Sequence, residues 1–185
     1  MAIKIVDGTG GGQVCKVNSG NRLYTNAITK STDAQINIES GKVWSVNVEN
    51  QSPTAGDDYI MYIKNTGDAV LHITDIRFSS GTAATQIKVE SVSGTAANGT
   101  DVTPVSRTAG SAALPTATTQ VGADITGLTT GGTLFFIQCP TVDKQEHLST
   151  SSRVRIPKGL AVGISVEAST AVITGTVSLV EETES

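Results

Sequence analysis

The stretch Leu160-Ala161-Val162-Gly163-Ile164-Ser165-Val166-Glu167 alternates large apolar residues with small or polar ones without a break. Successive side chains of an extended strand point to opposite faces, so this period of two places the large apolar residues on one face. The preceding Ile156-Pro157-Lys158-Gly159 predicts a β-turn, because proline presets φ and glycine closes the turn. We therefore expect a half-buried antiparallel strand, joined in a C-terminal hairpin to a further strand at residues 171–179.

The same alternation recurs from Arg22 onward in short segments bounded by turn-forming residues. Residues 59–63 are apolar on both faces, which predicts a central strand covered on either side, and the turn at 65–68 predicts a hairpin with residues 70–78. Residues 86–90 alternate polar and apolar side chains, which is typical of a strand with one wet face. Strands are also expected at 36–38 and 44–48. Residues 143–148 leave room for one or two helical turns.

Composition agrees with an all-β fold. Val, Ile and Thr make up 60 of the 185 residues, and these β-branched side chains favour strands. A chain of this length suits one domain. We expect an antiparallel β-sandwich over residues 22–181, preceded by an arm at 1–21 and followed by an acidic tail at 182–185.

Two segments differ from the rest of the chain. The arm starts with the short alternation Ile3-Lys4-Ile5 and passes into Gly8-Thr9-Gly10-Gly11-Gly12, which predicts flexibility. In residues 93–133, 28 of 41 residues are Gly, Ala, Ser or Thr. This small-residue insertion has two interpretations: a long flexible loop, or an ordered segment that lies flat against a neighbouring protein.

Charge and hydropathy argue against several classes. The net charge is −4 and the 13 basic residues are scattered singly, so no positive stripe is present for nucleic acid. Apolar runs such as 134–137 are far shorter than the roughly 20 residues that cross a bilayer. The first residues show no secretory signal, so we expect synthesis and assembly in a cytoplasm. There Cys15 and Cys139 are expected to be two separate thiols.

The sequence offers few candidates for catalysis, metal binding or cofactor binding. The glycines at 8–12 lack the spacing of a phosphate-binding loop. Zinc sites need three or four ligands, and the chain has two histidines. We interpret His72 as a hydrogen-bonded structural residue. His147 lies near Asp143, Glu146 and several serines, but no Gly-x-Ser-x-Gly motif accompanies it. We expect no enzyme activity, no cofactor and no metal.

Two further clusters have a structural and a functional interpretation. Asp57 and Asp58 lack the spacing of a calcium loop, so we expect a solvated turn that caps the next strand. Trp44, Tyr59 and Tyr62 have the chemistry of a sugar-binding platform, but a sandwich with few aromatic residues needs them in its core. We expect all three to be buried.

Several stretches carry a resemblance to a known class of proteins. They are 19–23, Gly41-Lys42-Val43-Trp44-Ser45-Val46, 58–65 running into 71–76, and 155–162. Together they resemble small structural proteins of tailed bacteriophages, over most of residues 19–181. The resemblance implies a jelly-roll or related β-sandwich, commonly a homotrimer, that sits on the virion as a capsid decoration or cement protein. Residues 93–133 match no known pattern of that class.

This class implies a non-enzymatic role and contacts with the major capsid protein. We expect the arm to make such contacts through Ile3, Ile5, Gly10, Gly11 and Gly12, because symmetry multiplies weak contacts into avidity. An alternative is a phage tail, baseplate or receptor- and glycan-binding module, which would present its aromatic residues on an exposed loop end. A hydrolase on a β scaffold is a third class, against which the shortage of histidine argues.

Overall fold

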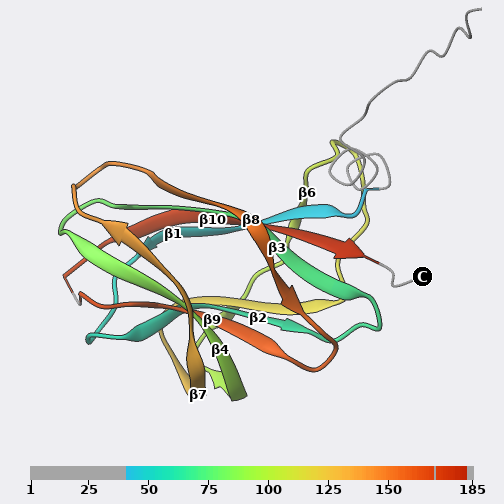
Figure 1. Ribbon diagram of the computed structural model, residues 1–185, viewed down its shortest axis with the longest axis horizontal. Helices are drawn as coiled ribbons and strands as arrows, with labels where there is room; N and C mark the ends of the chain where they lie inside the picture. The colour runs from blue at the N-terminus through green and yellow to red at the C-terminus, as the bar shows by residue number, and fades with distance from the viewer. Residues whose placement is uncertain (1–40, 169, 183–185) are drawn as a thin grey trace, which may run out of the picture. The chain divides into compact units, whose positions relative to one another are not determined.

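The computed structural model describes residues 41–168 and 170–182, apart from the side chains of residues 149–153 (Figure 1). Within this part of the chain every regular element is a strand. The strands are β1 (Val43–Gln51), β2 (Asp58–Asn65), β3 (Val70–Ser80), β4 (Thr85–Ala97), β5 (Thr100–Asp101), β6 (Val105–Ser106), β7 (Ala117–Cys139), β8 (Glu146–Ile156), β9 (Ala161–Val166) and β10 (Ile173–Glu182). The predicted all-β class is confirmed. The suggested helical turns at 143–148 are wrong, because β8 begins at Glu146.

The strands form two antiparallel sheets that pack together as a β-sandwich. The first sheet has the order β6-β1-β10-β3-β8, and the second has the order β2-β9-β4-β7-β5. The main pairs are nested: β1 pairs with β10, β2 with β9, β3 with β8 and β4 with β7. The chain therefore resembles one long hairpin, with its apex between β4 and β7, that has been rolled into two layers.

Consecutive strands on each arm of this long hairpin lie in opposite sheets. β2 belongs to the second sheet and β3 to the first, and the same holds for β9 and β10. The two predicted hairpins, of residues 59–63 with 70–78 and of residues 160–166 with 171–179, are therefore wrong. The turns that join these strands are arches between layers, which lets both strands bury a face in the same core.

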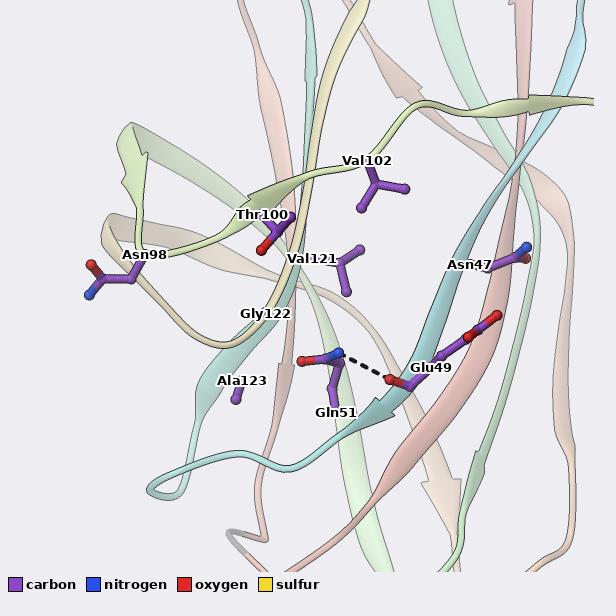
Figure 2. Close-up of a pocket in the computed structure, with 9 residues that line it drawn as sticks. All are labelled: Asn47, Glu49, Gln51, Asn98, Thr100, Val102, Val121, Gly122 and Ala123. Carbon is purple, nitrogen blue, oxygen red and sulfur yellow. Dashed lines mark hydrogen bonds between the residues drawn. The ribbon is translucent and has the colours of Figure 1, made fainter.

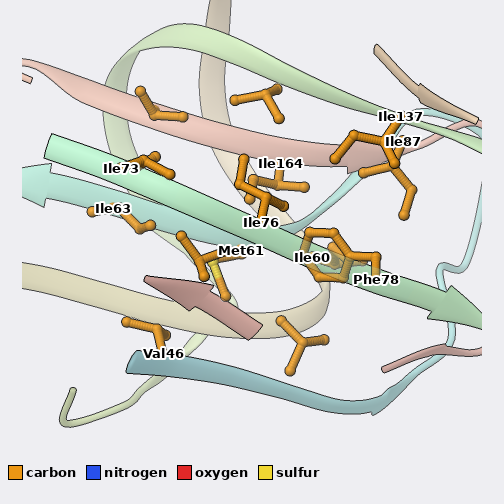
Figure 3. Packing of buried hydrophobic residues seen from close by; sticks show 14 of the residues in the cluster. Val46, Ile60, Met61, Ile63, Ile73, Ile76, Phe78, Ile87, Ile137 and Ile164 are labelled. Carbon is orange, nitrogen blue, oxygen red and sulfur yellow. The ribbon is translucent and has the colours of Figure 1, made fainter. Parts of the chain in front are cut away.

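The main core lies between the sheets and is filled by branched apolar side chains (Figure 3). Trp44, Val46 and Val48 of β1 face it, as their alternation predicts, and Val46 and Val48 have no exposed surface. Large side chains that are fully buried include Ile60, Met61, Ile63, Ile73, Ile76, Phe78, Ile87 and Ile164. Burial of each such side chain stabilises the fold by about 1.5–3 kcal/mol.

The second sheet also closes on itself. Residues 117–125 of β7 pair with β2, whereas residues 126–139 pair with β4. Because β2 pairs with β9 and β9 with β4, these four strands form a complete circuit. A smaller apolar cluster fills the face turned away from the main core; its buried members are Tyr62, Val92, Ile125 and Ala161. All six residues of β9 are buried, so the prediction of a half-buried strand is wrong.

Residues 93–133 are largely part of the sheets. They contain the end of β4, all of β5 and β6, and most of β7. Strand β6 belongs to the first sheet, where it pairs with Trp44 and Ser45 of β1. The interpretation as one flexible loop does not describe these strands, and contact with a neighbouring protein stays a prediction. The proposed arm at 1–21 and the start of the domain at residue 22 lie outside the described residues, as do residues 183–185 of the tail.

Candidate interaction surface

A cleft opens at one side of the sandwich, between the end of β1 and the strands β5 and β7 (Figure 2). Its volume is about 620 Å³. The lining residues are Asn47, Glu49, Gln51, Asn98, Thr100, Val102, Val121, Gly122 and Ala123. The residues between β5 and β6 cross from the second sheet to β1 and bound the cleft at one end. The cleft is therefore framed by the edges of both sheets.

The second half of β1 is an unpaired edge on the cleft side. Residues 43–51 of β1 pair with β10 on one side, but on the other side only Trp44 and Ser45 have a partner strand among the described residues. The side chain of Gln51 donates a hydrogen bond from Nε2 to the backbone oxygen of Glu49 at 3.0 Å (Figure 2). A side-chain amide thus occupies a carbonyl that would otherwise be available to the N–H of another strand.

The charge of the cleft is negative. Glu49 is exposed in the cleft, and none of the described residues that line it is basic. Asp101 and Asp124 directly adjoin lining residues in the sequence. Val102 and Val121 add an apolar surface to this polar rim. The combination of open backbone groups, one apolar surface and a carboxylate suits an extended peptide segment with a positive charge.

A second polar feature lies beneath the long strand β7. The Glu90 side chain is 8% exposed, and its oxygens accept hydrogen bonds from Ser165 Oγ at 3.1 Å and from Thr130 and Thr133 Oγ1, each at 3.3 Å. Burial, together with a hydrogen bond to Glu90, raises the pKa of Tyr59 to about 12. Buried carboxylates need such partners. This network ties β7 to β4 and β9 and has a structural explanation.

Trp44, Tyr59 and Tyr62 do not form an exposed platform. Trp44 is 1% exposed and donates its indole N–H to the Ala113 oxygen at 2.8 Å. Tyr62 is 4% exposed, and burial raises its pKa. Tyr59 is half-buried against the smaller cluster. The expectation that these side chains serve the core is confirmed for Trp44 and Tyr62.

The two histidines lie on the first sheet with carboxylates beside them. His72 is buried, and its Nε2 atom lies 3.4 Å from a Glu182 oxygen, in keeping with a structural role. His147 is exposed and contacts Asp75 through Nε2. Asp75 also accepts a hydrogen bond from Arg77 Nε at 2.9 Å. The backbone register places Ser149 opposite Asp75, but the Ser149 side chain is outside the description.

The two neighbouring carboxylates at 57 and 58 point to different partners. Asp58 Oδ2 accepts hydrogen bonds from the backbone of Thr54 and Ala55 at 2.8 and 2.6 Å, which closes the loop before β2. Asp57 Oδ1 lies 2.6 Å from Lys88 Nζ, and this hydrogen bond raises the pKa of Lys88. Asp58 therefore acts in the turn before β2, as predicted, whereas Asp57 pairs with Lys88 of β4. Within the described residues no group of three or more His, Cys, Asp or Glu side chains is placed to hold a metal.

Several predicted residues lie outside the described part of the chain. These are the arm residues Ile3, Ile5, Gly10, Gly11 and Gly12, together with Cys15. Cys139 is buried in the core, where desolvation raises the pKa of its thiol. Within the part of the chain that the structure describes, no helix is long and apolar enough to cross a membrane. Comparisons with protein families, with curated proteins and with solved structures find no match to this chain.

The sequence analysis did not identify the cleft. Its residues come from β1, from β5 with the residues on either side of it, and from β7, and most of them are ordinary polar or small residues. A possible signal is the run Glu49-Asn50-Gln51, where the inward-facing apolar alternation of β1 stops. At this point the pairing of β1 with β10 shifts register and Asn50 takes a positive φ of 50°.

Proposed function

We propose that this chain is a structural protein of a tailed-bacteriophage virion, a capsid decoration protein that stabilises the shell through non-covalent contacts with the major capsid protein. The nested pairing of β1–β10, β2–β9, β3–β8 and β4–β7 carries the proposal. A long hairpin rolled into two sheets is the pattern of a jelly-roll, an architecture used by viral capsid domains. It supports assigning the sandwich to that class, which the sequence resemblance also implies.

The part of the outer face of the first sheet around Thr174 and Thr176 of β10 supports a contact role. Asn47 and Thr176 form a hydrogen bond of 2.9 Å there, and Ser79 and Thr174 one of 3.4 Å. Short side chains already held by neighbours lose little conformational entropy when a partner covers them. A face of this kind suits many weak, repeated contacts on a symmetric shell.

The test is co-expression of the chain with the major capsid protein encoded by the same phage genome. We expect shells that carry the chain at regular positions in electron cryomicroscopy images and that withstand higher temperature than bare shells. A β-sandwich from an unrelated protein, added in the same way, is the control. Shells that assemble without bound chain and show unchanged stability would contradict the proposal, and binding of the chain to host glycans would then favour the receptor-binding alternative.

A further inference from the structure

The cleft has the features of a slot for one more strand. Strand β6 occupies the first half of the β1 edge, at Trp44 and Ser45, and the cleft continues along the same edge beside residues 47–51 (Figure 2). Across the cleft, Thr100 and Asp101 belong to β5, at the edge of the second sheet. Exposed edges recruit extended segments, because backbone hydrogen bonds give affinity and alternate side chains give specificity.

The walls of the cleft define the side chains that such a segment needs. Val102 is half-buried and Val121 is 7% exposed, and the surface that both leave in the cleft is apolar, so residues of the added strand that face them should be apolar. Glu49 lies at the rim without a basic neighbour among the lining residues. The residue of the added strand that lies between its two apolar residues should therefore be positive. Since alternate residues of a strand face opposite sides, the required pattern is apolar–basic–apolar.

This pattern selects a segment of the chain itself. Stretches with the pattern at 76–78, 87–89 and 154–156 already lie in the core strands β3, β4 and β8. Ile36-Asn37-Ile38 lacks the positive charge and is followed by Glu39. The remaining matches are Ile3-Lys4-Ile5 and Cys15-Lys16-Val17, of which the first has the larger apolar residues.

We propose that the cleft beside residues 47–51 receives Ile3-Lys4-Ile5 of a neighbouring copy as an added strand, with Lys4 opposite Glu49. The inference rests on the proposed function, which places copies side by side on a shell. Between Ile5 and Gly41 lie 35 residues, and an extended chain spans up to about 3.3–3.6 Å per residue. A connection of that length is long enough to reach an adjacent copy, and the N–H groups of the added strand replace the Gln51 amide on the Glu49 carbonyl.

The test is a charge exchange in the full chain. Glu49→Lys and Lys4→Glu should each weaken association of copies about tenfold, because each places like charges together. Sedimentation velocity over a range of concentrations measures the association. A chain that carries both substitutions should regain it. Glu167→Lys, an equal change in charge on an exposed residue outside the cleft, and Lys16→Glu are the controls and should leave association unchanged.

Mixing the two single variants separates exchange between copies from insertion within one copy. If the segment enters a neighbour, a mixture of Glu49→Lys and Lys4→Glu chains should associate more strongly than either variant alone, because every arm then finds a complementary cleft. No gain on mixing, no effect of either substitution, or an effect of Lys16→Glu in place of Lys4→Glu would overturn the proposal. Association that follows this pattern in a chain that binds no shells would leave the inference standing and refute the proposed function.

Discussion

At the scale of single residues, Asn65 shows how a polar side chain decides the path of the chain. It is 2% exposed, and its Nδ2 atom donates hydrogen bonds to the backbone oxygens of Ala69 at 2.7 Å and Ile156 at 2.8 Å. Its Oδ1 atom accepts one from the backbone N–H of Gly67 at 2.9 Å. One side chain thus supports the arch from β2 to β3 and also ties it to the end of β8.

We therefore expect Asn65→Ala to lower the free energy of unfolding by about 3 kcal/mol, because the backbone oxygens of Ala69 and Ile156 lose a donor, while the Gly67 N–H keeps only its bond to the Thr116 oxygen. Denaturant unfolding measures this change. Asn47→Ala removes an exposed hydrogen bond to Thr176 and should cost about 0.5 kcal/mol or less. Equal effects of the two substitutions would show that the arch does not depend on Asn65.

The raised pKa of Tyr59 predicts how the free energy of unfolding changes at alkaline pH. Its pKa is raised from 10.0 to about 12 in the folded chain, chiefly by burial and then by the hydrogen bond to Glu90. Between these two pH values the folded state holds a proton on Tyr59 that the unfolded state has lost. The contribution of Tyr59 to the free energy of unfolding is therefore fully present below pH 10 and is lost as the pH rises towards 12. The melting temperature of Tyr59→Phe should fall less steeply over this range than that of the unsubstituted chain. Parallel curves would refute this role of Tyr59.

At the scale of elements, the period-2 alternation located most strands of the described chain but not their partners. Residues 44–48, 59–63 and 70–78 lie in β1, β2 and β3, close to their predicted bounds. Alternation defines which side chains share a face, but it does not distinguish a hairpin from an arch. That difference is made by contacts such as the hydrogen bond of Asn65 to Ile156, which is 91 residues away.

Strand β7 was missed because its residues are small. At Gly94 and Gly127 φ is +103° and +77°, and a Cβ atom at either position would lie 2.3 Å from a backbone oxygen of the opposing strand. Glycine permits this close approach of β4 and β7. Residues whose composition is typical of a loop therefore form the strand that closes the second sheet and buries Glu90. The cleft could not be predicted either, because it depends on where the chain crosses from β5 in the second sheet to β6 in the first.

At the scale of the whole molecule, the nested pairing makes the sandwich one cooperative unit. Neighbouring strands in either sheet come from distant parts of the chain: Val43 pairs with Val180 in the outermost pair, and Val89 with Phe135 in the innermost. Each sheet draws strands from both halves of the sequence, so neither half of the chain can form a complete sheet alone. Proteins dominated by such non-local strand pairs fold slowly, over milliseconds to seconds.

This arrangement predicts a single unfolding transition. Trp44, the one tryptophan of the chain, is buried in the first sheet, whereas far-ultraviolet circular dichroism reports both sheets. The two signals should give superimposable denaturation curves. Leu179→Ala, which removes a fully buried side chain from β10, should shift both curves together and cost about 3 kcal/mol. If the fluorescence transition came first and much of the dichroism signal survived it, the second sheet would be stable alone, and the rolled hairpin would not be the unit that folds.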